Sequence, residues 1–392
     1  MRPLDGITVV ALEHAVAAPF CTRQLADLGA RVVKIERPGG GDFARAYDQR
    51  VRGLSANFVW LNRSKESLTL DIKHPKARPI LEKLLARADV LVQNLAPGAT
   101  ARLGLSYDAL KETYPRLIVC DVSGYGDVGP YRAKKAYDLL VQSEAGLLSL
   151  TGTPGTPCRA GLPVVDVAAG MYAYGNVLAA LIARAKTANG CRIDVALFEA
   201  AVEWLGFPLY FSFDGAPQPP RTGAAHAAVY PYGPFAAGDG KIVMLGLHNE
   251  REWKTFCDEV LRRPELAADA RFASNLERVA ARQELDAIII QAFAGLSAND
   301  VEARLDAAGI ANARMNDMRG VWAHPQLKAR GRWMEVDTPA GKIPALRPPG
   351  VPNNVGVRMD PVPALGQHTD AILREIGYDA AAVAELRTAG AI

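Results

Sequence analysis

The first third of the chain alternates short apolar runs with helix-like patterns, and this alternation constrains the fold more than any other feature of the sequence. Four runs have the length and residue types of buried strands, at residues 7–12, 31–36, 90–93 and 117–122. Helical patterns separate them, such as the one over residues 74–88. Strands and helices in alternation predict an α/β fold, with a parallel sheet, helices on its faces and right-handed connections.

A second, smaller domain is indicated further along the chain. With 392 residues the chain exceeds one ordinary hydrophobic core, so we expect two domains. The composition changes at residues 215–220 (GAPQPP), which predicts a linker. Beyond the linker, strand and helix patterns predict a smaller α+β region. Residues 339–363 contain seven prolines and are expected to form a long extended segment.

The overall composition excludes several classes of protein. Hydrophobic residues make up 49% and charged residues 22%, as in soluble globular proteins and unlike disordered chains. The net charge of +3 is small and the Lys and Arg residues are dispersed, so nucleic acid is not an expected partner. The five cysteines and six histidines lack the close spacing of a metal site, which predicts reduced thiols, no metal and a cytoplasmic protein. The longest apolar stretches, such as residues 177–183, are too short for a membrane span, so no membrane association is expected.

Small and basic residues follow the predicted strands, at the edge of the sheet where such folds bind ligands. The turn at residues 13–19 (EHAVAAP) lacks the G-x-G-x-x-G pattern of dinucleotide-binding proteins, so an NAD enzyme is not expected. Its alanines would admit a flat ligand, or would form only a tight turn. Arg37 is followed closely by three glycines and could pair with a phosphate or stay solvated. With the basic stretch at residues 62–73, Asn94 and Arg102, these loops favour an anionic, phosphorylated cofactor.

Asp166 is the acidic residue with the most unusual surroundings. It lies in the segment 161–170 (GLPVVDVAAG), among apolar and small residues, at the start of a predicted long helix. One interpretation is a helix N-cap, which is a common role for Asp. The other is a carboxylate nucleophile in a partly desolvated pocket.

Several segments, taken in order, resemble those of the family III CoA-transferases, the group that includes formyl-CoA:oxalate and carnitine CoA-transferases. The matching segments are LADLGARVVKIERPGGGD, LNRSKESLTLDIKHP, LVQNLAPGATARLGL, VSGYGDVGPY, LSLTG, PVVDVAAGMYA, YPYGPF and ALGQHT. The resemblance covers nearly the whole chain. It implies a large Rossmann-like domain over residues 1–214, completed by residues 335–392, and a small α+β domain over residues 221–330. It also implies a homodimer in which the two chains interlock.

The resemblance implies a mechanism and a set of ligand-binding residues. Asp166 would attack an acyl-CoA thioester to give a mixed anhydride, and the released CoA would then form an aspartyl-CoA thioester. The acceptor acid would then run the same steps in reverse order. CoA thioesters are therefore substrates, and no permanently bound cofactor is expected. The residues that match the family's CoA-binding positions are Val16, Ala18, Arg37, Leu70, Lys73, Asn94, Arg102, Lys135 and Tyr137. The four cations among them would meet phosphates.

Two departures from the family pattern narrow the activity. Formyl-CoA transferases carry a run of glycines where residues 221–228 (RTGAAHAA) contain one, which argues against oxalate as the acceptor. The α-methylacyl-CoA racemases share the fold and place a His-Asp pair where this chain has Tyr137 and Asp138. One base for α-proton exchange is then missing. A racemase or epimerase remains the alternative enzyme, and a CoA-binding protein with a degenerate site is the non-enzyme alternative.

The acceptor acid is predicted from two further segments. Residues 13–20 and 45–54 are similar to those of bacterial transferases for itaconate, mesaconate or citramalate, which commonly use succinyl-CoA as the donor. A C4–C5 dicarboxylate acceptor needs cations or hydrogen-bond donors for its second carboxylate. The candidates are His14, Arg45, Arg50, Arg52 and His226. Surface salt bridges for the arginines and packing for His14 are the structural alternatives.

Overall fold

The computed structural model describes residues 1–350 and 353–392 and divides into two compact units. The larger unit comprises Met1–Ala145, Ala160–Gly206 and Gln326–Ile392, and the smaller unit comprises Gly146–Arg159 and Phe207–Pro325. The predicted domain boundaries are wrong at three places: residues 146–159 and 207–214 belong to the smaller unit, and residues 326–330 belong to the larger unit. Hydrogen bonds explain the first difference, because the guanidinium of Arg221 donates to the carbonyl oxygens of Thr153, at 2.9 Å, and Pro154, at 2.6 Å.

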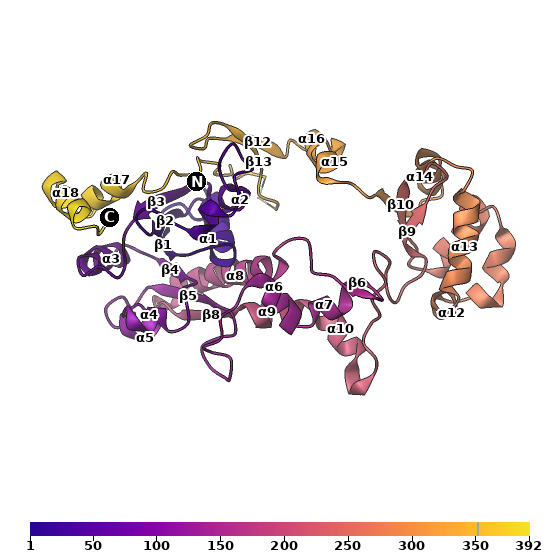
Figure 1. Cartoon of the computed structure of the whole chain (residues 1–392), viewed down its shortest axis with the longest axis horizontal. Helices are drawn as coiled ribbons and strands as arrows, with labels where there is room; N and C mark the ends of the chain where they lie inside the picture. The colour runs from indigo at the N-terminus through magenta and orange to yellow at the C-terminus, as the bar shows by residue number, and fades with distance from the viewer. Residues whose placement is uncertain (351–352) are drawn as a thin grey trace. The chain divides into compact units, whose positions relative to one another are not determined.

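The larger unit is built on a parallel sheet of six strands (Figure 1). The strands are β1 (Thr8–Leu12), β2 (Arg31–Glu36), β3 (Lys65–Thr69), β4 (Val90–Gln93), β5 (Ile118–Ser123) and β8 (Arg192–Ala196). Their order in the sheet is β3-β2-β1-β4-β5-β8, and every neighbouring pair is parallel. The chain thus builds outward from β1 in one direction and then in the other, so the switch point lies between β1 and β4. The predicted parallel α/β fold is confirmed.

Helices cover both faces of this sheet because the strands are apolar on both sides. Val9 and Ala11 of β1 belong to the core on the face of α1 (Ala17–Asp27) and α8 (Val164–Thr187). Val10 and Leu12 belong to the opposite core, on the face of α3 (Ala77–Leu85), α17 (Thr369–Glu375) and α18 (Ala380–Thr388). Successive side chains of a strand point to opposite faces, so a continuous apolar run is what this sandwich requires.

The helix α8 is the long core helix of the larger unit. Of the described helices, it is the one whose length and hydropathy would suffice to cross a membrane. Its small residues Ala168, Ala169 and Ala173 are fully buried against the sheet and α1. The contact with α1 is close, since a Cβ on Gly170 would lie 2.6 Å from the carbonyl oxygen of Ala17. Packing in the core accounts for the apolar residues on one face of α8, whereas Met171 and Ile182 are exposed.

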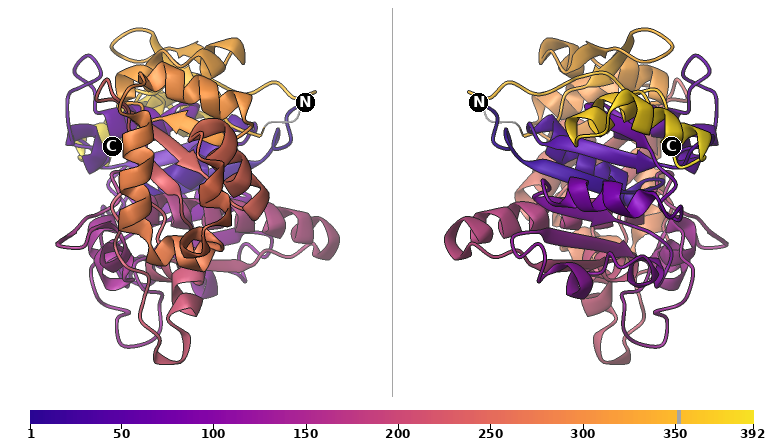
Figure 2. Two further views of the ribbon diagram at one scale, coloured as in Figure 1. Left: turned by 90° about the vertical axis from the view of Figure 1, so that its right-hand side faces the viewer. Right: turned by 90° about the vertical axis from the view of Figure 1, so that its left-hand side faces the viewer.

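The C-terminal segment closes the free edge of the sheet at β3, and α17 and α18 then lie beside the N-terminal strands (Figure 2). Ser67 lies at the centre of these contacts: its backbone N–H donates to Nδ1 of His368 at 3.1 Å, and its carbonyl oxygen accepts from the His368 N–H at 2.9 Å. The Gly366 N–H donates to Oγ of Ser67 at 2.9 Å. The edge strand therefore has no unpaired run of backbone groups.

The prediction that residues 339–363 form one long extended segment is wrong in part. Within it, β13 (Ile343–Leu346) pairs antiparallel with β12 (Trp333–Val336) to form a hairpin. Residues 351–352 of the predicted segment lie outside the described residues.

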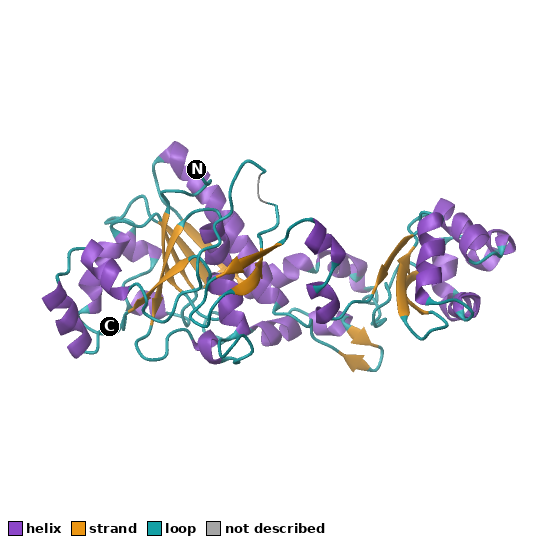
Figure 3. Cartoon of the chain, turned by 90° about the horizontal axis from the view of Figure 1, so that it is seen from above, coloured by secondary structure: helices purple, strands orange, loops and turns teal. Residues whose placement is uncertain are grey.

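The smaller unit has an antiparallel sheet with helices packed on it (Figure 3). The strands β9 (Tyr232–Ala236), β10 (Ile242–Gly246) and β11 (Ala311–Arg314) lie in the order β11-β10-β9. The larger helices are α13 (Arg282–Phe293) and α14 (Ala298–Ala307), whose buried residues form one core with the strands. The unit is therefore of the α+β class.

Candidate active site

Asp166 lies in the first turn of α8, and its side chain does not cap that helix. The residue before the helix is Pro163, and no side chain of α8 makes a capping hydrogen bond. Instead Oδ1 of Asp138 accepts the backbone N–H groups of Val165, at 2.9 Å, and Asp166, at 3.3 Å. The N-cap interpretation of Asp166 is therefore wrong, because Asp138 from α6 (Asp138–Glu144) supplies the acceptor.

The Asp166 carboxyl group is partly buried and has an unusual pKa. Burial, and secondly the negative charge of Asp138, raise the pKa of Asp166 to about 7. Among the described residues, neither carboxylate is within ion-pair distance of a cation. Asp166 is therefore a carboxylate of unusual basicity, which is the property that favours a nucleophile over a structural acid.

An aromatic series runs from the turn after β1 to Tyr47, which is close enough to Asp166 to be affected by its charge. The rings of His14 and Phe43 stack with centroids 5.4 Å apart, and Phe43 contacts Tyr47 at 5.7 Å. Burial, followed by the charges of Asp42, Asp166 and Tyr137, raises the pKa of Tyr47 to about 12. Tyr47 therefore lies within electrostatic range of Asp166, and its hydroxyl group is a neutral hydrogen-bond donor at pH 7. Sequence reasoning noted the surrounding segment 45–54 but missed this residue, whose aromatic side chain in a polar stretch was the available signal.

The predicted ligand-binding turn after β1 lies at the switch point of the sheet. The His14 N–H donates to Oδ1 of Asn94 at 2.8 Å, and Nδ2 of Asn94 donates to the His14 carbonyl oxygen at 2.8 Å. Val16 and Ala18 follow, both buried. Burial chiefly lowers the pKa of His14, so the ring is neutral at pH 7, and its buried Nδ1 has no hydrogen-bond partner among the described residues. The structure thus brings together four of the predicted site residues.

A fully buried ionic network supports this turn. Nζ of Lys65 donates to Oε1 of Glu13 at 2.7 Å, and Nζ of Lys34 donates to Oδ2 of Asp42 at 2.9 Å and to Oε1 of Glu13 at 3.3 Å. Oδ1 of Asp42 accepts the N–H of Ala15, which has a φ of 60°. Sequence reasoning missed the network, although a lysine in the middle of the apolar run VVKIE was a visible signal.

The four cations predicted to meet CoA phosphates are exposed side chains. None of them has an ion-pair partner within the described part of the chain; they are Arg37, Lys73, Arg102 and Lys135. The first three follow β2, β3 and β4, at the carboxyl edge of the sheet. Two other predicted residues differ in exposure, since Leu70 is buried and Tyr137 is 65% exposed. The free ammonium and guanidinium groups are available to anionic ligands.

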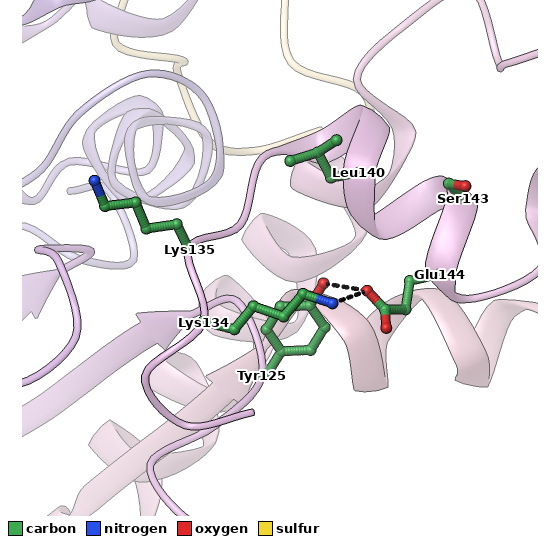
Figure 4. Close-up of a pocket in the computed structure, with 6 residues that line it drawn as sticks. All are labelled: Tyr125, Lys134, Lys135, Leu140, Ser143 and Glu144. Carbon is green, nitrogen blue, oxygen red and sulfur yellow. Dashed lines mark hydrogen bonds and ion pairs between the residues drawn. The ribbon is translucent and has the colours of Figure 1, made fainter. Parts of the chain in front are cut away.

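Lys135 borders a cavity of about 490 Å³ (Figure 4), whose other lining residues are Tyr125, Lys134, Leu140, Ser143 and Glu144. Lys134 forms an ion pair with Glu144, which also accepts the Tyr125 hydroxyl at 3.0 Å. The Lys135 amine extends away from this pair. The loop before α6 is therefore fixed by Lys134, and Lys135 remains free.

The structure separates the five candidates for the acceptor's second carboxylate. Arg45 forms a bidentate pair with Glu36, at 2.8 Å for each bond, and donates to the Pro363 carbonyl oxygen at 3.3 Å. The guanidinium is thus already occupied, which supports the structural alternative for Arg45. Arg50 and Arg52 are exposed and have no ion-pair partner among the described residues.

The remaining candidate, His226, belongs to the smaller unit. Its Nδ1 accepts the N–H groups of Ala228, at 3.1 Å, and Val229, at 3.0 Å. The ring proton is therefore on Nε2, which is left as a donor. The ring stacks on Tyr232 with an interplanar angle of 2°.

The six-stranded parallel sheet and its strand order define an α/β protein of Rossmann-like architecture. Sequence comparison specifies the group. The profile of CoA-transferase family III matches residues 4–369, and the chain belongs to that family. The family predicted from the motifs is thereby confirmed, and the enzyme is a CoA-transferase.

Two curated relatives and one solved structure illustrate the similarity. An acyl-CoA transferase of Fusarium pseudograminearum is 37% identical over 406 residues, covering 99% of this chain and 88% of the relative. The human succinyl-CoA:glutarate CoA-transferase is 36% identical over 400 residues, covering 100% of this chain and 90% of the relative. A CaiB/BaiF family protein from Brucella suis has a crystal structure with a TM-score of 0.84 and 34% identity, covering 96% of this chain and 99% of that one.

Proposed function

We propose that this enzyme transfers CoA from succinyl-CoA to a C4–C5 dicarboxylate acceptor, such as glutarate, itaconate or mesaconate, with Asp166 as the nucleophile. The observation that carries the proposal is the partly buried Asp166 carboxylate at the start of α8, with a pKa of about 7 and no cation within ion-pair distance in the described residues. The human relative is named for succinyl-CoA, the thioester of a C4 dicarboxylate, and for glutarate, a C5 dicarboxylate, which supports the substrate class.

The proposed reaction conserves the energy of the thioester bond. An oxygen of Asp166 attacks the acyl carbon of the donor, the C–S bond breaks, and CoA leaves as a thiolate while the acyl group and Asp166 remain joined as a mixed anhydride. The thiolate then attacks the Asp166 carbonyl carbon, and the donor acid leaves as a carboxylate. The acceptor carboxylate repeats these two steps in reverse order and regenerates the ionised Asp166. No water is consumed, so the site must exclude water while the anhydride exists.

The residues of the carboxyl edge would hold the substrates. Arg37, Lys73, Arg102 and Lys135 would pair with CoA phosphates, because their cationic groups are exposed and unpaired among the described residues. The aromatic series from His14 to Tyr47 offers a surface for the acyl part of the substrate. For the acceptor's second carboxylate we retain His14, Arg50, Arg52 and His226, and not Arg45.

We also propose an interlocked homodimer in the cytoplasm. Large apolar side chains are exposed at and after α10 (Gly206–Phe211), including Phe207, Tyr210 and Phe213, which are 55%, 80% and 73% exposed. Monomeric proteins rarely expose apolar groups in such a series, and a second chain would cover them. Light scattering is expected to give twice the chain mass, and a monomeric, active enzyme would reject the dimer.

One incubation with mass spectrometry tests the activity. The enzyme is mixed with succinyl-CoA and a panel of mono- and dicarboxylic acids, and new acyl-CoA products are identified. We expect dicarboxyl-CoA products and a CoA adduct on the peptide that contains Asp166, both absent from Asp166→Ala. Turnover of monocarboxylates alone would reject the acceptor class. The racemase alternative predicts deuterium incorporation at Cα of the acyl group without acyl exchange.

A further inference from the structure

The carboxylate of Asp138 is held in a chain of hydrogen bonds that ends at the candidate nucleophile. Oδ1 accepts the N–H groups of Val165, at 2.9 Å, and Asp166, at 3.3 Å, at the start of α8. Oδ2 accepts Nε2 of Gln142 at 2.6 Å. Gln142 is fully buried, and its Oε1 accepts the Ala160 N–H at 3.0 Å. Both oxygens of Asp138 and both ends of the Gln142 amide are thus engaged.

This chain fixes the backbone of the nucleophile from outside its own helix. The first N–H groups of a helix have no partner within it, and α8 provides no capping side chain. Asp138 supplies that acceptor from α6, and Gln142, one turn further along α6, prevents the carboxylate from rotating away. The Asp166 side chain is therefore not needed as a cap and remains available for chemistry.

The same arrangement places two carboxylates close together in a partly buried site. Apart from burial, the titratable group that raises the pKa of Asp166 among the described residues is Asp138 from α6. Asp166 itself raises the pKa of Tyr47, in the segment after the 3-10 helix Phe43–Ala46. Tyr137 acts on Tyr47 in turn. No cation lies within ion-pair distance of Asp138 in the described part of the chain, so no ion pair compensates its negative charge.

We propose that Asp138 is a positioning residue for the transfer reaction, which fixes the start of α8 at Asp166 and keeps a negative charge beside that carboxylate. The inference rests on the proposed role of Asp166 as the nucleophile. In this role Asp138, held by Gln142, affects the reactivity of Asp166 in addition to capping the start of α8.

The negative charge has two chemical consequences. A more basic Asp166 carboxylate is a stronger nucleophile once ionised, and a poorer leaving group than an ordinary carboxylate, whose pKa is about 4–5. When the CoA thiolate meets the mixed anhydride, the attack that expels the donor acid is thus favoured over the attack that expels Asp166. Each covalent intermediate also removes the charge of Asp166, so the repulsion from Asp138 is relieved when the intermediate forms.

Two substitutions separate the charge from the hydrogen bonds to α8. Asp138→Asn removes the charge and the acceptor for Gln142, but retains an oxygen that can accept the two N–H groups of α8. Asp138→Ala removes all three. The rate of CoA-adduct formation on the Asp166 peptide is measured from pH 5 to 9 in single turnovers with succinyl-CoA. Thermal unfolding of each variant reports whether it is folded.

We expect the wild-type rate to fall at low pH with a midpoint near pH 7, since Asp166 must be ionised to attack. In Asp138→Asn the midpoint is expected to move down by about one pH unit or more, and the adduct at equilibrium to fall about 10-fold. Asp138→Ala is expected to lose about 100-fold in rate at every pH, because the start of α8 is then released.

Three results would overturn the inference. The first is a pH midpoint in Asp138→Asn equal to that of the wild-type enzyme. The second is an adduct-formation rate in Asp138→Ala equal to that of the wild-type enzyme. The third is a pH midpoint near 4 in the wild-type enzyme itself, which can be observed without any variant. An absent adduct in the wild-type enzyme would instead reject Asp166 as the nucleophile. The failure of this inference and the failure of the proposed function are therefore distinguishable.

Discussion

Replacing Arg45 by Met distinguishes a structural arginine from one that binds substrate. The Arg45 side chain is 17% exposed, pairs with the fully buried carboxylate of Glu36, and lies with its Cζ atom 3.7 Å from the centre of the Phe58 ring. Burial tends to raise the Glu36 pKa, but the hydrogen bonds from Arg45 and the charge of Lys34 outweigh it and lower the pKa from 4.5 to about 2. That difference corresponds to about 3 kcal/mol in favour of the charged form in the folded state.

The expected loss of stability follows from these contacts. Removing one partner of a buried pair typically costs about 3–5 kcal/mol. Lys34 still acts on Glu36 in the variant and Ser67 still donates to it, so we expect about 2–4 kcal/mol. For a unit of this size that is a fall of about 4–8 °C in the unfolding midpoint.

Calorimetry and steady-state kinetics, applied to the same samples, measure both quantities. Arg45→Met is expected to unfold at a lower temperature and to keep the acceptor KM of the wild type at temperatures where it is folded. Arg50→Met is the matched control, since Arg50 is exposed and no ion pair holds it among the described residues; its midpoint is expected to stay unchanged. An unchanged midpoint for Arg45→Met together with a tenfold higher acceptor KM would refute the structural role.

Three further predictions concern acid stability, helix packing and CoA binding. Because the Glu36 pKa is lower in the folded state, its contribution of about 3 kcal/mol to stability is present above pH 4.5 and is lost as the pH falls toward 2. The free energy of unfolding, measured in urea, is therefore expected to depend less on pH in Glu36→Gln than in the wild-type enzyme. Equal pH dependence in the two proteins would contradict this. Gly170→Ala places a methyl group 2.6 Å from the Ala17 carbonyl oxygen and is expected to cost about 1–3 kcal/mol in denaturant unfolding, whereas a neutral result would mean that α1 and α8 can separate freely. Lys73→Ser and Arg102→Ser are each expected to raise the KM for acyl-CoA about 10-fold, with less effect at high salt, and to leave the acceptor KM unchanged; a change confined to the acceptor KM would place them outside the CoA site.

Four strands of the sheet, β1, β2, β4 and β5, were predictable because they are buried on both faces and therefore read as short apolar runs. By contrast, β3 has the polar sequence KESLT and was assigned to a basic loop. Its Lys65 and Ser67 point into hydrogen-bond networks with Glu13 and Glu36, and such partners lie far away along the chain. Hydrophobic periodicity cannot report a strand whose buried side chains are polar.

The candidate nucleophile was identified correctly as a residue of interest, but its local role was not decidable from the sequence. An aspartate near the start of a helix has the pattern of an N-cap, and only the structure shows that Asp138 performs that function 28 residues away. Arg45 shows the converse difficulty. An arginine in a polar segment suggests ligand binding. Its bond to Glu36 depends on how the 3-10 helix that contains Arg45 packs against the end of β2.

The hydrogen bonds between the C-terminal segment and Ser67 bear on how the chain is synthesised. Ser67 and its partner His368 are 301 residues apart, and at about 5–20 residues per second the ribosome needs about 15–60 seconds to cover that interval. During this time β3 is a nascent edge strand with open hydrogen-bonding groups, which is a template for pairing with other chains. Until the last segment emerges, the backbone groups of Ser67 that bond to His368 in the folded chain are therefore open to contacts with other chains.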